Sequence, residues 1–325
     1  MVSKVKPIAL VTRRMPSAVL APLYTACDVD LHDHRGSLSH ADLCARLVGK
    51  HGLICMFNDR IDEVALSAGD KLEVISTVAV GVDNIDVSAA KDRGITVTNT
   101  PDILAGATAE LTWALLLAVM RRIGEGDRLI RNRNWTGWAF DFLLGTELRG
   151  KQLGIIGAGR IGQAVAAIAP AFGMRAVYAA RLGQSEGKVA SALPVLSLDE
   201  LLLTSDVVSV HVPLTADTRH LINRRTLVRM KRSAFLINTS RGGVVDDTAL
   251  AWALDQRLIA GVGLDVFEDE PQVHSDLIAR ENVCLTPHLG SATRETRTAM
   301  AELAVRNVLE VLEGRSALTP VVLDG

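Results

Sequence analysis

The stretch Leu153-Gly154-Ile155-Ile156-Gly157-Ala158-Gly159-Arg160-Ile161-Gly162 decides the fold. It combines a short apolar strand, a turn with the spacing G-x-G-x-x-G, and the start of an apolar helix. Gly157 allows the tight turn, Gly159 lets backbone amides approach a pyrophosphate, and Gly162 permits close packing of the helix on the strand. The amino end of the helix adds partial positive charge for the phosphates. The stretch therefore predicts a dinucleotide-binding β-α-β unit.

The end of the next predicted strand indicates which dinucleotide is preferred. An NAD site places an acid about 20 residues after the first glycine, where it binds the ribose hydroxyls. Here the strand Arg175–Ala180 ends without an acid, and Arg181 follows it. An arginine binds the additional phosphate of NADP through charge-assisted hydrogen bonds, whereas a carboxylate repels it. We therefore expect NADP(H) to be preferred over NAD(H) through Arg181, with the nearby Glu186 weakening the preference.

Apolar, β-rich runs alternate with helical patterns on both sides of this unit. The runs extend from Ile8–Val11 to Ile95–Thr98 before it, and they continue to Val283–Thr286 after it. Strands that alternate with helices in this way favour parallel sheets. Long helices are predicted from Ile103 to about Arg131 and from about Thr293 to Glu313. We expect an α/β fold with two Rossmann-like or flavodoxin-like domains, each a doubly wound parallel sheet.

The composition excludes several classes of protein. The chain carries 35 Lys and Arg against 37 Asp and Glu, so it offers no basic surface for nucleic acid. The longest uncharged stretch, Ile161–Met174, is shorter than the roughly 18 residues that span a bilayer. The apolar run Pro7–Thr12 is too short for a signal peptide, the four cysteines form no C-x-x-C pair, and His32-Asp33-His34 lacks metal-ligand spacing. We expect a cytoplasmic protein with no membrane, nucleic-acid or metal partner.

Three polar segments follow predicted strands of the second sheet, at the edge where open α/β sheets bind ligands. They are Leu236–Gly243, Gly261–Pro271 and Leu285–Gly290. Together they supply an arginine (Arg241), a histidine (His288) and one of three neighbouring acids (Glu268, Asp269 and Glu270). Reduction of a 2-oxo acid by a nicotinamide needs a cation for the substrate carboxylate and an acid for the new alkoxide, and a histidine next to a carboxylate provides that acid.

With Val78–Asp86, Ala107–Glu110 and His211–Leu214, these segments resemble the D-isomer-specific 2-hydroxyacid dehydrogenase family over essentially the whole chain. The connector Asn132–Lys151, with its Trp135-Thr136-Gly137-Trp138, and the Ala180-Arg181 pair resemble its glyoxylate/hydroxypyruvate reductase branch. The resemblance implies reduction of small 2-oxo acids, glyoxylate and hydroxypyruvate, to glycolate and D-glycerate. Two alternatives stay open: D-3-phosphoglycerate dehydrogenase or another D-2-hydroxyacid dehydrogenase, and an NAD(P)-sensing, corepressor-like binding protein.

The resemblance also implies roles for individual residues. Arg241 would bind and polarise the substrate, and Glu270 would pair with His288, the general acid. Backbone amides of Val80 and Gly81 would share the substrate carboxylate. Phe57 would line the substrate pocket, where family members often carry a smaller residue, so the preferred oxo acid stays open. The expected cofactor-binding residues are Thr108, Gly157, Gly159, Arg160, Ile161, Gly162, Arg181, His211, Pro213, Thr239, Asp265 and Gly290.

The family's substrate domain is discontinuous, which agrees with a final helix that follows the last strand of the second sheet. We therefore predict a substrate-binding domain over residues 1–100, a dinucleotide-binding domain over residues 101–290, and a C-terminal return of the substrate-binding domain over residues 291–325. The resemblance further implies a homodimer, with the long helix and the following connector at the interface. One tryptophan of that connector, which we assign as Trp138, would reach the partner's active site.

Overall fold

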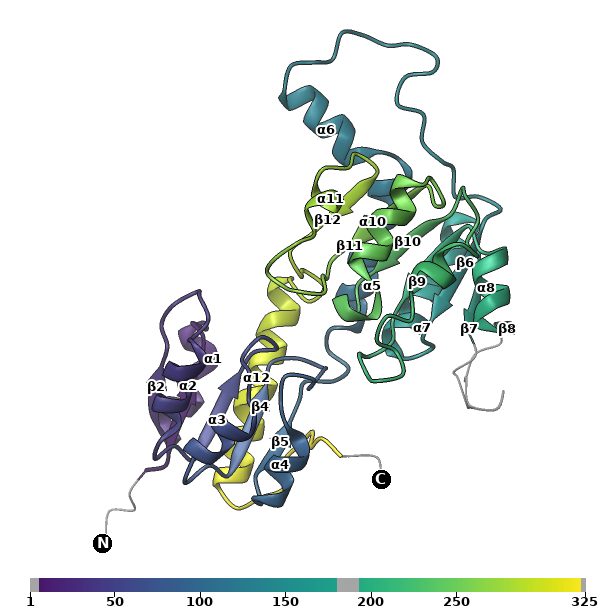
Figure 1. Cartoon of the computed structure of the whole chain (residues 1–325). Helices are drawn as coiled ribbons and strands as arrows, with labels where there is room; N and C mark the ends of the chain where they lie inside the picture. Colours follow the sequence, from purple (N-terminus) through teal and green to yellow (C-terminus); the bar gives the residue numbers. More distant parts are fainter. Residues whose placement is uncertain (1–5, 180–192, 323–325) are drawn as a thin grey trace, which may run out of the picture. The chain divides into compact units, whose positions relative to one another are not determined.

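The computed structural model describes residues 6–179 and 193–322, and these residues form two units, each with its own sheet (Figure 1). Unit 1 comprises residues 1–104 and 292–325, and unit 2 comprises residues 105–291. In both sheets every neighbouring pair of strands is parallel, which confirms the predicted α/β fold class. The predicted inner domain, residues 101–290, has bounds close to those of unit 2. The functions predicted for the two domains stay predictions.

Unit 1 is a doubly wound sheet with the strand order β2-β1-β3-β4-β5. Its strands are β1 (Ile8–Val11), β2 (Asp28–Leu31), β3 (Gly52–Cys55), β4 (Val74–Thr77) and β5 (Thr96–Thr98). Its helices are α1 (Ser17–Ala26), α2 (His40–Leu47), α3 (Glu63–Ala68), α4 (Val87–Asp92) and α12 (Arg294–Leu312). The strand order reverses between β1 and β3, so the carboxyl ends of these strands are where such a sheet binds ligands.

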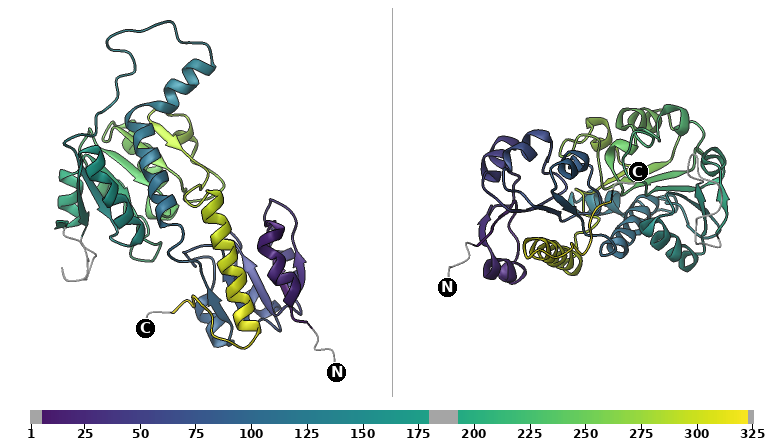
Figure 2. Two further views of the ribbon diagram at one scale, coloured as in Figure 1. Left: turned by 180° about the vertical axis from the view of Figure 1, so that it is seen from behind. Right: turned by 90° about the horizontal axis from the view of Figure 1, so that it is seen from below.

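Successive side chains of the unit 1 strands enter opposite apolar layers, because side chains alternate between the faces of a strand. Leu53 and Cys55 pack with α2, α3 and α4, whereas Ile54 packs with α1 and α12. Figure 2 shows α12, in yellow, beside α1, in purple. The last long helix, α12, therefore covers one face of the sheet that the first residues of the chain begin.

Unit 2 has the strand order β12-β11-β10-β9-β6-β7-β8. Its strands are β6 (Gln152–Ile156), β7 (Arg175–Ala179), β8 (Val195–Leu196), β9 (Val207–Val210), β10 (Phe235–Asn238), β11 (Gly261–Leu264) and β12 (Val283–Leu285). Its α-helices are α5 (Ala105–Met120), α6 (Ile123–Arg131), α7 (Arg160–Ile168), α8 (Leu198–Thr204), α9 (Arg224–Leu227), α10 (Asp247–Asp255) and α11 (Ser275–Ile278). Helices α5 and α7 cover one face, and α8 to α11 cover the other. The order reverses between β6 and β9, next to the glycine turn.

The long helix predicted from Ile103 to about Arg131 is wrong in one respect, because the structure divides it into α5 and α6. Arg122, between them, has a left-handed backbone with φ of 54°. The connector returns here, and Thr146 donates its N–H to the Met120 carbonyl at the end of α5 (2.8 Å). This contact satisfies a carbonyl that a continuing helix would use internally. None of the helices in the described ranges has both the length and the apolar character needed to span a bilayer.

Candidate active site

The glycine turn after β6 uses its three glycines for three different reasons. Gly157 has φ of 106°, and a Cβ there would lie 2.5 Å from the His211 carbonyl oxygen. A Cβ on Gly162 would lie 2.0 Å from the Gly157 carbonyl oxygen, so α7 packs directly on the turn. A Cβ on Gly159, the residue before α7, would have none of the described atoms within 4 Å, and the glycine has no side chain to cap the helix. The turn is thus a cradle that a Cβ would fill, and it fits a dinucleotide pyrophosphate.

His211 joins this turn from the neighbouring strand β9. Its N–H donates to the Ile156 carbonyl (2.7 Å), and its ring Nε2 lies 2.8 Å from the Ser209 hydroxyl. Burial lowers the pKa of His211 to about 3, so the ring is neutral at physiological pH. Nδ1 is buried and has no partner among the described residues. A buried polar atom without a partner beside the turn is consistent with a site that a ligand completes.

Other predicted cofactor residues lie at the same edge of unit 2. Thr108, in α5, donates its hydroxyl to the Gly290 carbonyl (3.2 Å). Thr239, after β10, exchanges a hydrogen bond with Thr112 (2.8 Å). Pro213 is exposed in the loop after β9. Arg181, the predicted NADP determinant, lies outside the described residues, so its place is a prediction.

Asp265, a predicted cofactor-binding residue, binds the neighbouring loop through its carboxylate. One oxygen accepts hydrogen bonds from the Leu289 N–H and the Thr286 hydroxyl (both 2.6 Å), and the other accepts from the Gly290 N–H (2.8 Å). The side chain is fully buried, and burial raises the pKa of the carboxyl. Its backbone carbonyl also accepts from the His288 N–H (2.9 Å). Asp265 therefore fixes the loop in which His288 adopts a left-handed φ of 53°.

The structure selects one of the three candidate acids as the partner of His288. Glu270 Oε2 lies 2.8 Å from His288 Nδ1, and Glu270 Oε1 accepts the Phe267 N–H (3.1 Å). Glu268 instead binds Arg219 and the His220 ring, each at 2.7 Å. Glu270 therefore holds one of the two ring nitrogens of His288, Nδ1, and so orients the ring.

Arg241 follows β10 and lies in a loop packed against the loop that carries Glu270. A Cβ on the next residue, Gly242, would lie 1.9 Å from the Phe267 carbonyl group, so the two backbones are in direct contact. Asn238 holds the Arg241 carbonyl through its side-chain amide (3.0 Å). Strands β10, β11 and β12 are neighbours in the sheet. The structure therefore places Arg241, Glu270 and His288 on adjacent loops at one edge.

Asp247, at the start of α10, is a supporting acid that the sequence analysis missed. Its carboxylate accepts a hydrogen bond from the Glu268 N–H (3.1 Å) and so anchors the loop after β11 that carries Glu270. Burial raises the pKa of Asp247 to about 6. The only signal in the sequence is the Asp246-Asp247 pair before an apolar helix, which indicates a helix start and nothing about a distant loop.

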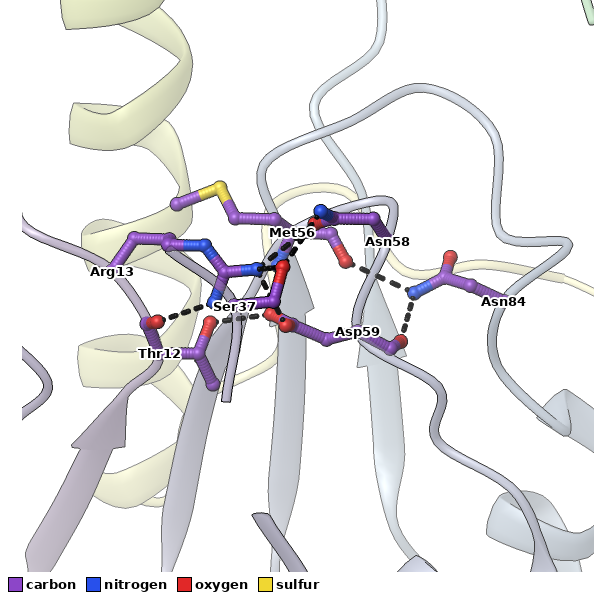
Figure 3. A network of polar contacts seen from close by, with 7 residues as sticks. All are labelled: Thr12, Arg13, Ser37, Met56, Asn58, Asp59 and Asn84. Carbon is purple, nitrogen blue, oxygen red and sulfur yellow. Dashed lines mark hydrogen bonds and ion pairs between the residues drawn. The ribbon is translucent and has the colours of Figure 1, made fainter. Parts of the chain in front are cut away.

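In unit 1, a buried ion pair holds the loop after β3 that contains Phe57 (Figure 3). Arg13 and Asp59 are 8% and 3% exposed, and their side chains lie 2.9 Å apart. Asp59 also accepts the Met56 N–H (2.8 Å). The side-chain amide of Asn84, from the loop after β4, donates to the Met56 and Asp59 carbonyls (3.1 and 2.7 Å). The network thus joins the two loops that carry the predicted substrate residues Phe57, Val80 and Gly81.

The connector after α6 exposes large apolar side chains. Trp138 and Phe140 are 82% and 85% exposed, and Trp135 and Leu144 are more than half exposed. Figure 1 shows α6 and the connector extending away from the sheet of unit 2. Within this single chain, Trp138 is a surface residue.

The chain is similar to known proteins along nearly all of its length. Residues 113–290 match the family model described as D-isomer specific 2-hydroxyacid dehydrogenase, NAD binding domain. A glyoxylate reductase of Aeropyrum pernix is 44% identical over 315 residues, which cover 95% of this chain and 94% of that protein.

Solved structures give the same result. The TT0316 protein from Thermus thermophilus is 48% identical, with a TM-score of 0.90, over 97% of this chain and 100% of that one. An NADPH-dependent glyoxylate/hydroxypyruvate reductase from Sinorhizobium meliloti, solved with NADP and malonate, is 34% identical. Its TM-score is 0.87, over 98% of this chain and 97% of that one.

The glycine turn predicts a separation of stability from cofactor binding. Gly162→Ala should lower the free energy of unfolding by about 2 kcal/mol, because its Cβ has no room. Gly159→Ala should leave stability within about 0.5 kcal/mol but weaken NADPH binding at least about tenfold, because its Cβ fills the cradle. Chemical denaturation and NADPH fluorescence titration measure the two effects. Wild-type NADPH affinity in Gly159→Ala would contradict this assignment.

The raised pKa of Asp247 predicts a pH-dependent stability. Because burial favours its protonated form in the folded state, the stability that this residue contributes falls as pH rises from about 4 to 6. Asp247→Asn should therefore be more stable than wild type at pH 7, by up to about 3 kcal/mol, with the gain vanishing near pH 4. Urea denaturation across this range measures it, and Asp255→Asn, an exposed acid at the other end of α10, is the control. A gain that grows as pH falls would contradict the account.

Proposed function

Because the chain belongs to the D-isomer-specific 2-hydroxyacid dehydrogenase family and is an NAD(P)-dependent oxidoreductase, we propose that it reduces glyoxylate and hydroxypyruvate to glycolate and D-glycerate, with NADPH as preferred reductant. The observation that carries the proposal is the His288–Glu270 pair, at 2.8 Å, on the loops beside Arg241. The activity named for the Aeropyrum pernix and Sinorhizobium meliloti relatives supports this substrate class.

The reaction joins a hydride and a proton to the carbonyl of a 2-oxo acid. A bound reduced nicotinamide supplies the hydride to the carbonyl carbon. Arg241 binds the substrate carboxylate and polarises the carbonyl oxygen, which needs a fixed cation because negative charge develops there. The products are the 2-hydroxy acid and the oxidised nicotinamide.

His288 donates the proton to the carbonyl oxygen from Nε2 as the C–O double bond opens. Glu270 accepts a hydrogen bond from Nδ1, which sets the orientation of the ring and directs Nε2 to the substrate. Asp265 maintains the loop geometry that presents the ring. In the opposite direction the same nitrogen takes the proton from the hydroxyl.

Substrate recognition by unit 1 is assigned to backbone and apolar groups. The amides of Val80 and Gly81 bind the substrate carboxylate, and Phe57 limits the size of the substrate side chain. The Arg13–Asp59 pair supports this role, because a buried ion pair that binds the Met56 N–H keeps the loop of Phe57 in one conformation.

The preference for NADPH is assigned to Arg181. In the sequence, Ala179 at the end of the preceding strand is followed by another alanine and then the arginine, so the position that carries an acid in NAD sites has no carboxylate to repel a ribose phosphate. The Sinorhizobium meliloti relative, which is NADPH-dependent, supports this choice of cofactor.

The connector and α6 are assigned to a homodimer interface. Four large apolar side chains, Trp135, Trp138, Phe140 and Leu144, are each more than half exposed on one segment. Exposed apolar groups gathered in this way mark protein-protein contacts. A second copy of the chain is the occupant that the family resemblance favours, with Trp138 reaching the partner's active site. The protein is assigned to the cytoplasm.

The assigned chemistry predicts a selective loss in the His288→Asn variant. The wild-type enzyme should oxidise NADPH with glyoxylate and hydroxypyruvate, and His288→Asn should lower kcat by about 10²–10⁴-fold, because the proton donor is gone. Glu270→Gln should lose less. NADPH affinity should be unchanged in both variants, which a fluorescence titration checks. No turnover of either oxo acid by the wild-type enzyme would refute the proposed function.

Arg181→Ala should invert or abolish the cofactor preference. The wild-type enzyme is expected to show a higher kcat/KM with NADPH than with NADH, and removal of the guanidinium should lower only the NADPH value, by about tenfold or more. Steady-state kinetics with both cofactors at saturating glyoxylate measure the ratio. Arg160→Ala, at the glycine turn rather than at the ribose, should lower both values together. An unchanged ratio in Arg181→Ala would rule out this residue as the determinant.

A further inference from the structure

The peptide between Val80 and Gly81 is held by a side chain from the neighbouring strand. The side-chain amide of Asn99, directly after β5, donates to the Val80 carbonyl (2.8 Å). This peptide bond is trans, so its carbonyl and its N–H point in opposite directions. By holding the Val80 carbonyl, Asn99 directs the Gly81 N–H to the opposite side of the loop.

The loop that contains this peptide is anchored at its base and leaves its amides available. Thr100 donates its N–H to the Ala79 carbonyl (2.8 Å). None of the residues in the described ranges accepts a hydrogen bond from the backbone N–H groups of Val80, Gly81 or Val82. These three residues are half-buried. Successive amides without acceptors, held in one orientation, form a site suited to an anion such as a carboxylate.

Asn99 is in turn held by the C-terminal segment, residues 318–321, which lies next to β5 and is yellow in Figure 1. The Thr319 hydroxyl donates to the Asn99 carbonyl (2.6 Å). The Thr319 carbonyl accepts the Asn99 N–H (3.3 Å), and Val321 donates its N–H to the Val97 carbonyl (2.8 Å). The segment therefore binds Asn99 on both sides of its backbone.

The chain of contacts ends at a fully buried asparagine in α12. Asn307 donates its side-chain amide to the Thr319 hydroxyl (2.8 Å). Its side-chain oxygen accepts the N–H groups of Leu318 and Thr319 (2.9 and 3.1 Å). A buried amide needs such partners, and here all of them belong to the segment that holds Asn99. The contacts run without a gap from Asn307 through Thr319 and Asn99 to the Val80 carbonyl.

We propose that Asn99 is a positioning residue for substrate-carboxylate binding, and that Thr319 and Asn307 fix it from the C-terminal segment. The proposal rests on the proposed function, because the Val80 and Gly81 amides are assigned to the substrate there. Asn99 touches neither substrate nor cofactor in this account. It acts by keeping the Gly81 N–H aimed at the carboxylate, in the way that a preorganised donor lowers the cost of binding a charge.

Asn99→Leu tests the proposal, since leucine has a similar shape and no amide. KM for glyoxylate should rise about 10–30-fold, the effect of weakening one hydrogen bond to a charged group, while kcat stays within about threefold and the Kd of NADPH is unchanged. The inhibition constant of oxamate, an unreactive 2-oxo acid analogue, should rise in parallel. Asn282→Leu is the matched control, because Asn282 also donates its amide to a backbone carbonyl, that of Ala260 (2.9 Å), at the opposite end of a strand in unit 2.

Two variants of Thr319 give a second test with less risk to folding, because the backbone hydrogen bonds of the segment remain. Thr319→Val should raise KM for glyoxylate about 3-fold, and Thr319→Ser, which keeps the hydroxyl, should restore the wild-type value. A merely structural role would lower Tm in Thr319→Val without changing KM or the oxamate constant.

The outcomes separate this inference from the proposed function. Normal glyoxylate turnover by the wild-type enzyme, with unchanged KM and oxamate binding in Asn99→Leu and Thr319→Val, overturns the positioning role alone. A lower kcat and a weaker NADPH affinity that accompany the rise in KM to a similar extent also overturn it, because they indicate that the variant is misfolded as a whole. A wild-type enzyme that neither reduces glyoxylate nor binds oxamate overturns the proposed function and this inference with it.

Discussion

The contact between Gly242 and the Phe267 carbonyl is the constraint on which the proposed catalytic edge of unit 2 depends. A Cβ added at Gly242 would lie 1.9 Å from the Phe267 carbonyl group. Any side chain at this position would therefore force the loops after β10 and β11 apart. Asp265 then binds the loop after β12 with both carboxylate oxygens. Three loops are thereby joined into one structure, and the arginine, the carboxylate and the histidine have fixed mutual positions. A reaction in which negative charge develops on a carbonyl oxygen requires polar groups that are held in place in this way.

In both units, buried charged side chains bind the backbone of a loop at the edge of the sheet. In unit 2, Asp247 accepts the Glu268 N–H and so holds the loop that carries Glu270, although burial of the Asp247 carboxylate is unfavourable at neutral pH. In unit 1, the ion pair of Arg13 and Asp59 is almost fully buried and binds the loop of Phe57. Buried charges are costly unless their partners are complete. Their presence beneath loops, rather than in the centres of the apolar layers, indicates that they define loop conformation.

Local patterns in the sequence were sufficient for the fold class and for the glycine turn. A strand, G-x-G-x-x-G and a helix follow one another within ten residues, so their physical roles can be assigned before any tertiary contact is known. The choice among Glu268, Asp269 and Glu270 could not be made in this way, because neighbouring acids differ only in what the folded chain brings to them. The structure pairs Glu270 with His288 and Glu268 with Arg219. The same limit explains why Arg13 and Asp59, 46 positions apart, gave no signal. It also explains why the helix break at Arg122, which depends on a returning connector, was missed.

The central claim is that the residues at this edge hold a 2-oxo acid so that a hydride from NADPH reaches one face of its carbonyl. The most direct measurement uses hydroxypyruvate and NADPH that carries deuterium at the transferable position, followed by chiral analysis and mass spectrometry of the glycerate formed. The account predicts D-glycerate with deuterium at C2. L-glycerate, a racemic product, or D-glycerate without deuterium would contradict it.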